Sequence, residues 1–534
     1  MYQIALTFGV VTYLVFILGL LGKLTKNWLL LSLLIWFFCL AKETISHLPS
    51  WKKWLRKKKS WLVWFALGLF FCQIGLNVLN LLTPEIAFDA LWYHLTLPKL
   101  YLQEKKLDFF TGGLLYYSAM PQAMEMLYLL GLEFGGQVLA RSFHFLFGIL
   151  SSLVVYQLGR KFVKSNWALL GGFIFYSQLV VAWLSSAAYV DLTRTFLEIL
   201  GFLAILQWFE KRETKWLIKS GIILGLAVII KLLSLMSVLV LFSLICFYSG
   251  RKIKDSLIFL SSVLITSCPW FLYGAIKTGT IFYPFLTAWF WKTQTADLGL
   301  WNWLLTRTPL SLIKSFGQTS FSSGDILTPL FLISLPWLIL RSRLLLKDSK
   351  KLFLLIYFSL NFLVWFFIPL NYNRFLLPYT PFWIILILIV FEKEKINIQK
   401  IFLGSVLVIA LIHLGTRGIL SQRSLNFLIQ RQSLENFLEQ NLPENSGTLI
   451  DRTGFLKENV NFGEKVLIIN SHNLFYVPVA FDHYSWAQAD VKYKYLVVQN
   501  QELPKKWENL PLIHQDKQTA LKIYLFEQTL EDFK

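Results

Sequence analysis

Long apolar runs, each about the length that crosses a membrane, alternate with short polar segments along the first 420 positions. A transmembrane helix needs roughly 17–25 mostly apolar residues. The runs predict about 13 such helices, at 4–21, 28–41, 61–82, 137–159, 165–184, 194–210, 215–232, 233–249, 255–275, 326–346, 352–370, 375–392 and 399–416. A shorter apolar stretch at 118–134 is expected to lie along the interface or to re-enter the membrane. The pattern therefore predicts an all-α polytopic membrane protein.

Basic residues set the expected orientation of these helices, because loops rich in Lys and Arg stay in the cytoplasm. The most basic segment, 42–60, separates the second and third runs, and Lys23 and Lys26 are exceptions on the opposite side. The first run follows no basic segment and has no evident cleavage site, so we expect a retained span. The further loops assigned to the inside each carry at least three Lys or Arg: 160–164, 211–219, 251–254, 341–351 and 393–400.

Three segments are then expected on the outer side of the membrane. The first is 83–122, and the second is 277–328, whose many Trp and Phe residues suit a lid at the level of the lipid headgroups. The third is the polar tail at 425–534. The two N-terminal helices and basic loop at 1–60 precede a membrane core at 61–420.

The tail has the pattern of a small folded module. Short Val, Ile and Tyr-containing runs at 466–469 and 495–498 predict strands, while 433–442 and 518–521 are expected to be helical. We therefore expect a small extracytoplasmic α/β domain at the C-terminus.

Composition supports this class and excludes others. Hydrophobic residues make up 56% of the chain and charged residues only 15%, whereas soluble domains carry about 25% charged residues. The tail has 11 Lys or Arg against 14 Asp or Glu, a net charge of −3. Because the whole chain has a net charge of +20, the membrane part before the tail carries +23. Because this positive charge lies in short loops, it indicates orientation and no nucleic-acid partner. The four cysteines fall within or beside apolar runs and predict neither disulfides nor a metal site.

Two expected outer segments carry candidate carboxylates. Glu85 and Asp89 stand four residues apart, which would put them on one helix face. Asp89 follows a membrane exit among aromatic residues, where a raised pKa would suit a general base; an interfacial capping role is the alternative. Asp191 opens the next outer helix, where it could instead simply pair with Arg194.

Two cations are expected at the same membrane face. Lys231 ends an apolar run, and a lysine within a span costs about 3 kcal/mol on insertion scales, so such residues are functional by default. Arg374 lies at an outer helix entry, where its guanidinium could clamp a phosphate. Snorkelling of Lys231 and interface anchoring by Arg374 are the alternatives. Two carboxylates and two cations near one surface suit group transfer from a lipid phosphate.

Six motifs in this order resemble the GT-C superfamily of polyprenyl-phosphate-sugar-dependent glycosyltransferases, in particular the bacterial family-39-like enzymes with a mannosyltransferase or aminoarabinose-transferase type of membrane core. They cover roughly 60–420 and are Asp89 with Tyr93-His94-Leu95; Pro121 to Tyr128; Tyr189-Val190-Asp191; Gly225-Leu226-Ala227 with Lys231; Pro269-Trp270 to Phe282-Tyr283-Pro284-Phe285; and Arg374 with Pro378 and Pro381. The chain departs from many relatives at Ala90, where they carry a second acid, and at Thr280-Ile281, where they carry Asn-Pro.

The resemblance implies an inverting transfer of a sugar from an undecaprenyl-phosphate type of donor to a glycan, lipid or protein acceptor. It implies that Asp89 is the catalytic base, that Asp191 and Glu85 are supporting acids or metal ligands, and that Lys231 and Arg374 hold the donor phosphate. Three further residues match the family pattern and are assigned to substrate binding: His94, Glu125 and Tyr283.

The family resemblance implies no certain cofactor, and a divalent metal is compatible with it. We expect the protein in the cytoplasmic (inner) membrane, with its active site outside. A flippase or transporter for lipid-linked sugars is the main alternative; such folds often show internal repeats, and none is apparent here. A catalytically inactive scaffold is a second alternative.

Overall fold

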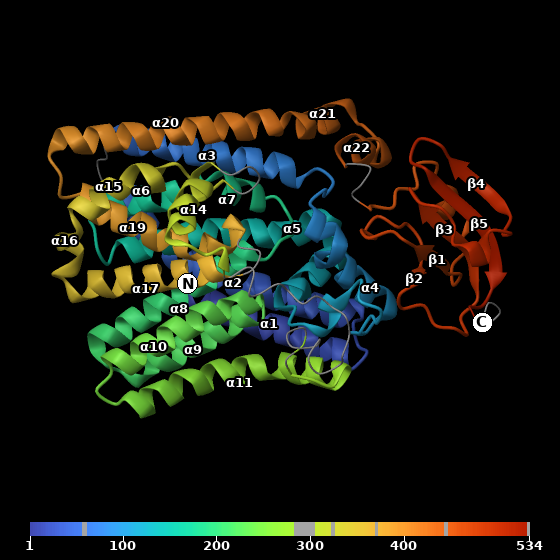
Figure 1. Ribbon diagram of the computed structural model, residues 1–534, viewed down its shortest axis with the longest axis horizontal. Helices are drawn as coiled ribbons and strands as arrows, with labels where there is room; N and C mark the ends of the chain where they lie inside the picture. The colour runs from blue at the N-terminus through green and yellow to red at the C-terminus, as the bar shows by residue number, and fades with distance from the viewer. Residues whose placement is uncertain are drawn as a thin grey trace.

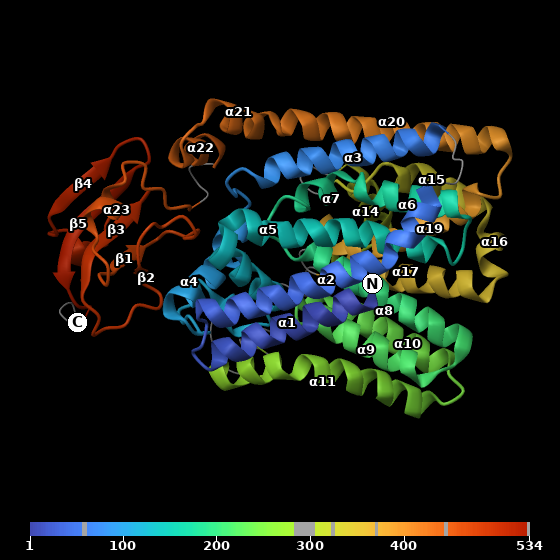
Figure 2. The same cartoon turned by 180° about the vertical axis from the view of Figure 1, so that it is seen from behind.

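The structure, a computed structural model, describes residues 1–55, 61–281, 283, 305–321, 326–368, 372–442 and 447–530. A bundle of long helices forms most of the molecule, and a small sheet domain sits at one end of it (Figures 1 and 2). The expected all-α membrane core with a small C-terminal α/β domain is therefore confirmed as a fold class. We call the end of the bundle that carries the sheet the domain-bearing end.

The first half of the chain contains α1 (Tyr2–Leu20), α2 (Lys26–Leu55), α3 (Trp61–Leu81), the π-helix η1 (Ala90–His94), α4 (Thr96–Glu104), η2 (Tyr116–Ala119), α5 (Ala123–Gly159), α6 (Ser165–Tyr176), α7 (Leu179–Leu184), α8 (Asp191–Lys211), α9 (Thr214–Val228), η3 (Leu232–Ser234), α10 (Leu235–Tyr248) and α11 (Lys252–Thr278). The second half contains α14 (Pro309–Phe321), α15 (Leu330–Leu340), α16 (Ser342–Leu346), α17 (Ser349–Phe367), α18 (Asn373–Leu376), η4 (Leu377–Tyr379), α19 (Thr380–Phe391), α20 (Ile396–Leu420), α21 (Gln422–Gln430), α22 (Leu434–Asn441), α23 (Phe455–Asn459) and η6 (Lys505–Trp507).

Within these described ranges, nine helical stretches are long and apolar enough to cross a membrane. Two shorter apolar helical stretches, Leu232–Tyr248 and Leu330–Leu340, add to them. Several expected spans are interrupted: the run at 165–184 forms α6 and α7, and the run at 326–346 forms α15 and α16. Polar residues such as Ser177 and Gln178 stand at the first of these breaks.

Most of the stretch at 118–134 belongs to α5, which begins at Ala123 and continues into the next span. Gly135 (φ −157°, ψ 17°) and Gly136 (φ 61°, ψ −158°) break the helical geometry inside α5. The chain bends so tightly there that a Cβ on Gly131 would lie 2.3 Å from the Cα of Ala140. A positive φ, as at Gly136, and a close backbone approach, as at Gly131, both favour glycine, so these two residues explain how an apolar stretch becomes a bent element.

The C-terminal sheet has the strand order β2-β1-β3-β5-β4. Its strands are β1 (Val466–Ile469), β2 (Phe481–His483), β3 (Tyr493–Gln499), β4 (Leu512–Asp516) and β5 (Leu521–Gln528). β1 pairs in parallel with β2 and β3, with Leu467 opposite Leu496, and β5 runs antiparallel to β3 and β4. The strands expected at 466–469 and 495–498 are present, and α22 occupies the helix expected at 433–442.

The helix expected at 518–521 is wrong: these residues turn the chain between β4 and β5. The Asp516 carboxylate accepts hydrogen bonds from the Gln518 N–H at 3.0 Å and the Thr519 hydroxyl at 3.0 Å. Ala520 takes a positive φ of 51°. A carboxylate that bonds backbone two residues ahead favours a turn over a helix.

The sheet domain docks onto the segment after α3 through specific contacts. The Lys99 ammonium donates to the carbonyls of Phe475, at 2.8 Å, and Val477. Gly112, at φ +78°, lies against the Ser485 backbone so closely that a Cβ there would sit 1.9 Å from its carbonyl oxygen. The His472 ring stacks on Phe88 at 5.1 Å. The tail therefore lies directly beside the segment that carries Asp89.

Candidate active site

Asp89 and Arg374 form an ion pair across the fold. Asp89 precedes η1, Arg374 belongs to α18, and Arg374 Nη2 lies 2.9 Å from Asp89 Oδ2. The two side chains are only 17% and 15% exposed. The partly buried position predicted for Asp89 is therefore present, and the carboxylate has a cationic partner.

Asp191 and Lys231 form a second pair. Asp191 is the first residue of α8 and is fully buried, and Lys231 Nζ lies 2.8 Å from its Oδ1. Lys231 occupies the break between α9 and η3, where its backbone is extended (φ −154°, ψ 123°). Among the described residues Asp191 Oδ2 has no hydrogen-bond partner. A buried carboxylate oxygen normally has such a partner, so this atom is poised to accept one.

One aromatic ring connects the two pairs. The Lys231 ammonium lies 4.5 Å from the centroid of the Phe375 ring, and the Arg374 guanidinium lies 5.4 Å from the same centroid. Arg374 also lies over the ring of Tyr189, at 5.1 Å. The structure therefore brings together the four charged side chains that the sequence singles out, although they come from four separate segments.

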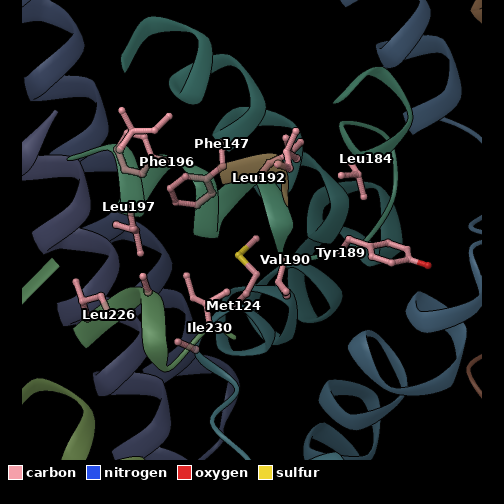
Figure 3. Close-up of a cluster of buried hydrophobic side chains, with 14 of the residues drawn as sticks. Met124, Phe147, Leu184, Tyr189, Val190, Leu192, Phe196, Leu197, Leu226 and Ile230 are labelled. Atoms are coloured by element: carbon pink, nitrogen blue, oxygen red, sulfur yellow. The ribbon is translucent and has the colours of Figure 1, made fainter. Parts of the chain in front are cut away.

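The turn that carries Asp191 is held by side chains from α5. His144 Nδ1 lies 2.9 Å from the Leu184 carbonyl oxygen and 3.0 Å from that of Ala187, and its Nε2 accepts the Leu192 N–H at 3.0 Å. These partners require a neutral ring with the proton on Nδ1. Apolar packing around the same turn, with Val190, Leu192 and Met124 among the buried side chains, completes the support (Figure 3).

The predicted helix face shared by Glu85 and Asp89 is not formed, because residues 84–87 are neither helix nor strand. The buried Glu85 carboxylate accepts the N–H groups of Ile86 and Ala87, each at 2.9 Å, and that of Ala188 at 2.7 Å. Its Oε2 also lies 3.3 Å from Nε of Arg141. Glu85 thus ties the segment before Asp89 to the turn before Asp191.

The alternative expectation, that Asp191 simply pairs with Arg194, is wrong. Arg194 Nε donates to Glu198 at 2.5 Å, and both side chains are fully buried. Ser234, Ser237 and Tyr379 complete this network. Neither the Arg194–Glu198 network nor His144 was identified as important from sequence. Ionisable residues inside apolar runs are the signal that could have found them.

His94 and Glu125 form a buried pair beside the site. His94 Nδ1 lies 2.6 Å from Glu125 Oε1, and both side chains are at most 5% exposed. The His94 ring lies 5.6 Å from that of Tyr189, which in turn contacts Arg374. Tyr189 therefore connects this pair to the charged side chains of the site.

Tyr283 lies near a group of aromatic side chains from the first outer segment. Its ring is 6.5 Å from that of Phe109. Burial, with Tyr116 adding to the effect, raises the pKa of Tyr283 to about 12. Tyr116 stacks on Tyr117 at 4.1 Å, and Tyr117 stacks on Tyr93 at 3.7 Å. Half of the lid expected over 277–328, including all its Trp residues, lies outside the described residues, and the described half contains α14.

The described residues do not assemble a metal-ligand set. Within them, no group of three or more His, Cys, Asp or Glu side chains is placed to hold a metal ion. The His94–Glu125 pair offers two donors, and each already binds the other.

Comparison with known proteins gives relatives by sequence family and by fold. Residues 126–273 match the family described as dolichyl-phosphate-mannose-protein mannosyltransferase. ArnT from Cupriavidus metallidurans bound to undecaprenyl phosphate has a TM-score of 0.56 at 13% identity, covering 87% of this chain and 97% of that one. The apo form of ArnT gives a TM-score of 0.57 at 13% identity, with 87% and 96% covered. A search of curated proteins finds no match.

The family match falls inside the bundle, from the start of α5 to a point five residues before the end of α11. It includes the turn that carries Asp191 and the break that carries Lys231. The ArnT match covers most of both chains, so the similarity extends over the bundle as a whole. The chain is thus a multi-pass membrane protein with the ArnT fold, and residues 126–273 match a mannosyltransferase family, as the predicted resemblance implies.

Proposed function

We propose that this protein is an inverting glycosyltransferase that moves a sugar from an undecaprenyl-phosphate type of donor to an acceptor on the outer side of the cytoplasmic membrane. The observation that carries the proposal is the gathering of two carboxylate–cation pairs around Phe375. ArnT, which shares the fold, was solved with undecaprenyl phosphate bound. A membrane-dissolved donor also suits an outward-facing site, because soluble nucleotide-sugars are made in the cytosol.

The reaction assigns one role to each charged side chain. The Asp89 carboxylate takes the proton from the acceptor hydroxyl or amine as that group attacks the anomeric carbon. The bond between that carbon and the phosphate oxygen breaks, and the lipid phosphate leaves with the electron pair. Lys231 and Arg374 neutralise the charge that develops on the phosphate. A phosphate is a good leaving group, so no strong general acid is required.

The remaining predicted residues serve positioning and binding. Asp191 orients Lys231 through their 2.8 Å contact. Glu85 fixes the segment before Asp89 through three backbone hydrogen bonds. His94, Glu125 and Tyr283 are assigned to the walls that receive the sugar and its acceptor, which is a glycan, a lipid or a protein.

The first test is transfer activity in membranes supplied with labelled lipid-phosphate sugar or with labelled nucleotide-sugar. We expect transfer only from the lipid-linked form. Asp89→Asn should lower the rate by about a hundredfold to ten-thousandfold, the range typical of a lost general base. Asp108→Asn is the matched control, because this carboxylate lies in the same outer segment and pairs with Lys106 at 3.0 Å. Dependence on nucleotide-sugar alone would overturn the proposal.

The same variant separates an enzyme from a flippase. A flippase would still move lipid-linked sugar across membranes that carry Asp89→Asn, whereas a glycosyltransferase loses product. Mass spectrometry of surface glycans from a deletion strain and its parent then identifies the sugar and the acceptor. Unchanged glycans in the deletion strain would contradict transfer by this protein.

A further inference from the structure

A polar cavity of about 220 Å³ is lined in part by the segment that carries Glu85. Its lining includes Asn80 at the end of α3, Arg141 in α5, Arg417 in α20 and Arg423 in α21. None of Asp89, Asp191, Lys231 and Arg374 lines it. The cavity therefore lies apart from those four charged side chains, and of the residues assigned above it shares only Glu85.

The lining is positively charged. Three arginines face a single carboxylate, that of Glu85, which gives the lining a net charge of +2. Arg141 is fully engaged, since it donates to the carbonyl oxygens of Asn80 and Ser186 and lies beside Glu85. No ion pair joins Arg417 or Arg423 to a carboxylate among the described residues, although the charge of Glu85 acts on Arg423.

Arg417 is the stronger indication that the cavity receives a ligand. The residue is only 3% exposed, and its guanidinium donates to the Ser186 hydroxyl at 2.5 Å. Its Nε is buried without a hydrogen-bond partner among the described residues. A buried guanidinium with an unused donor is costly unless an anion completes it. Arg423 lies at the exposed rim of the same cavity.

A fixed polar wall joins the helix ends around these arginines. The Asn80 side chain donates to Ser421 at 2.6 Å and accepts from Ser424 at 2.9 Å. The Thr83 and Ser424 hydroxyls lie 3.4 Å apart. All four side chains are at most 5% exposed. The cavity is therefore held in shape by hydrogen bonds between α3 and the start of α21.

The position of the cavity points to a lipid. It lies at the domain-bearing end of α3 and α20, which run side by side along one edge of the bundle (Figures 1 and 2). Only 22% of each spanning window in these two helices is buried inside the protein, against 89% for α8. The two helices whose ends form the cavity therefore turn much of their apolar surface outward, as helices that face lipid do.

We propose that this cavity binds the phosphate of an anionic lipid headgroup, with Arg417 and Arg423 as its ligands. An arginine fork matches phosphate oxygens in a bidentate way. A zwitterionic headgroup fits less well, because the lining has a net positive charge and the ammonium group would meet the third arginine, Arg141. The volume suits a headgroup and excludes a bulky ligand, since drug-sized sites measure about 300–1,000 Å³.

The test is binding of dihexanoyl phosphatidylglycerol, dihexanoyl phosphatidylcholine and inorganic phosphate to the delipidated full-length protein in detergent. We expect the phosphatidylglycerol to bind at least tenfold more tightly than the other two probes. Arg417→Gln and Arg423→Gln should each weaken its binding at least tenfold. Arg431→Gln is the control, because this arginine is exposed at the other end of α21 and does not line the cavity.

The outcomes separate the sources and the sites. Inorganic phosphate that binds as tightly as phosphatidylglycerol would overturn the lipid assignment, and so would equal binding of phosphatidylcholine. Arg423 lies at the rim of the cavity, so its substitution leaves the core intact. Unchanged binding of phosphatidylglycerol by Arg423→Gln would show that the lipid does not bind in this cavity. The double variant Lys231→Gln/Arg374→Gln should retain phosphatidylglycerol binding; if it alone loses that binding, the lipid occupies the candidate active site and the inference is wrong.

Discussion

The Asp191–Lys231 pair shows that a buried charge requires a partner of opposite charge. Removing one partner of a buried pair leaves the other charge without compensation, at a cost of about 3–5 kcal/mol. We expect Lys231→Met to lower the free energy of unfolding by about that amount, because Asp191 is fully buried. The double variant Lys231→Met/Asp191→Asn should regain most of the loss. Thermal or denaturant unfolding in detergent measures both, and strictly additive effects would show that the two charges are not coupled.

His483, in β2, makes the sheet domain sensitive to acid. Burial, with a smaller effect from His472, lowers the pKa of His483 from 6.5 to about 4. Its Nδ1 accepts the Ser485 N–H at 3.1 Å, which requires a neutral ring. Between these two pH values the unfolded chain binds a proton that the folded domain does not. Stability should therefore fall as the pH falls through this window, by up to about 3 kcal/mol.

Hydrogen exchange of residues 447–530 in the full-length protein, followed from pH 7 to pH 4, measures this loss. His483→Asn keeps an acceptor for the Ser485 N–H and removes the titrating group, so its profile should be flatter. A steep acid loss that persists in His483→Asn would assign the effect to another group.

At the scale of elements, the bend in α5 positions much of the site. Its first arm carries Glu125, and its second arm carries Arg141 and His144. Gly131→Ala would place a methyl group 2.3 Å from the backbone of Ala140, so the arms must separate. We expect lower thermal stability by several degrees and weaker transfer activity. Gly404→Ala in α20 is the control, because nothing lies within 4 Å of its Cβ position.

Gly404→Ala should be neutral or more stable, by up to about 1 kcal/mol, since alanine favours a helix over glycine. Equal effects of the two substitutions on thermal stability would mean that the close contact at Gly131 does not stabilise the fold.

Hydropathy predicted most of the helices because a helix that crosses lipid needs a long continuous run of apolar residues. Such a run can be recognised from consecutive residues alone. The breaks are different. The bend at Gly135 and Gly136 brings Gly131 against the backbone of Ala140, and only the folded chain reveals this contact. The same holds for the tail at 518–521, where a side chain from Asp516 selects a turn. Short polar segments without strong periodicity leave helix and turn undecided.

The candidate site was predictable to the extent that charge is rare near a membrane. Asp89, Asp191, Lys231 and Arg374 stood out for that reason, and the structure pairs them. Which carboxylate pairs with which cation was not predictable, because it depends on contacts between distant segments. The role of Glu85 in binding backbone N–H groups was missed for the same reason.

At the scale of the whole molecule, docking of the sheet domain rests on close backbone contact at Gly112. Gly112 and Gly113 both have a positive φ, of 78° and 89°, but only Gly112 would place a Cβ against Ser485. Alanine at either position is strained, by about 1 kcal/mol or more. We expect Gly112→Ala in addition to loosen the domain, with faster protease cleavage of the tail. Equal cleavage of the Gly112→Ala and Gly113→Ala proteins would show that this contact does not hold the domain.

The Asp89–Arg374 bridge spans 285 positions of the chain. At the usual speed of translation, about 5–20 residues per second, its two halves leave the ribosome roughly a quarter of a minute to a minute apart. During that interval the nascent chain holds Asp89 without its arginine, in a membrane that already contains the first helices. The bridge therefore closes only after most of the bundle has been inserted, and a chain that stops short of α18 never acquires it.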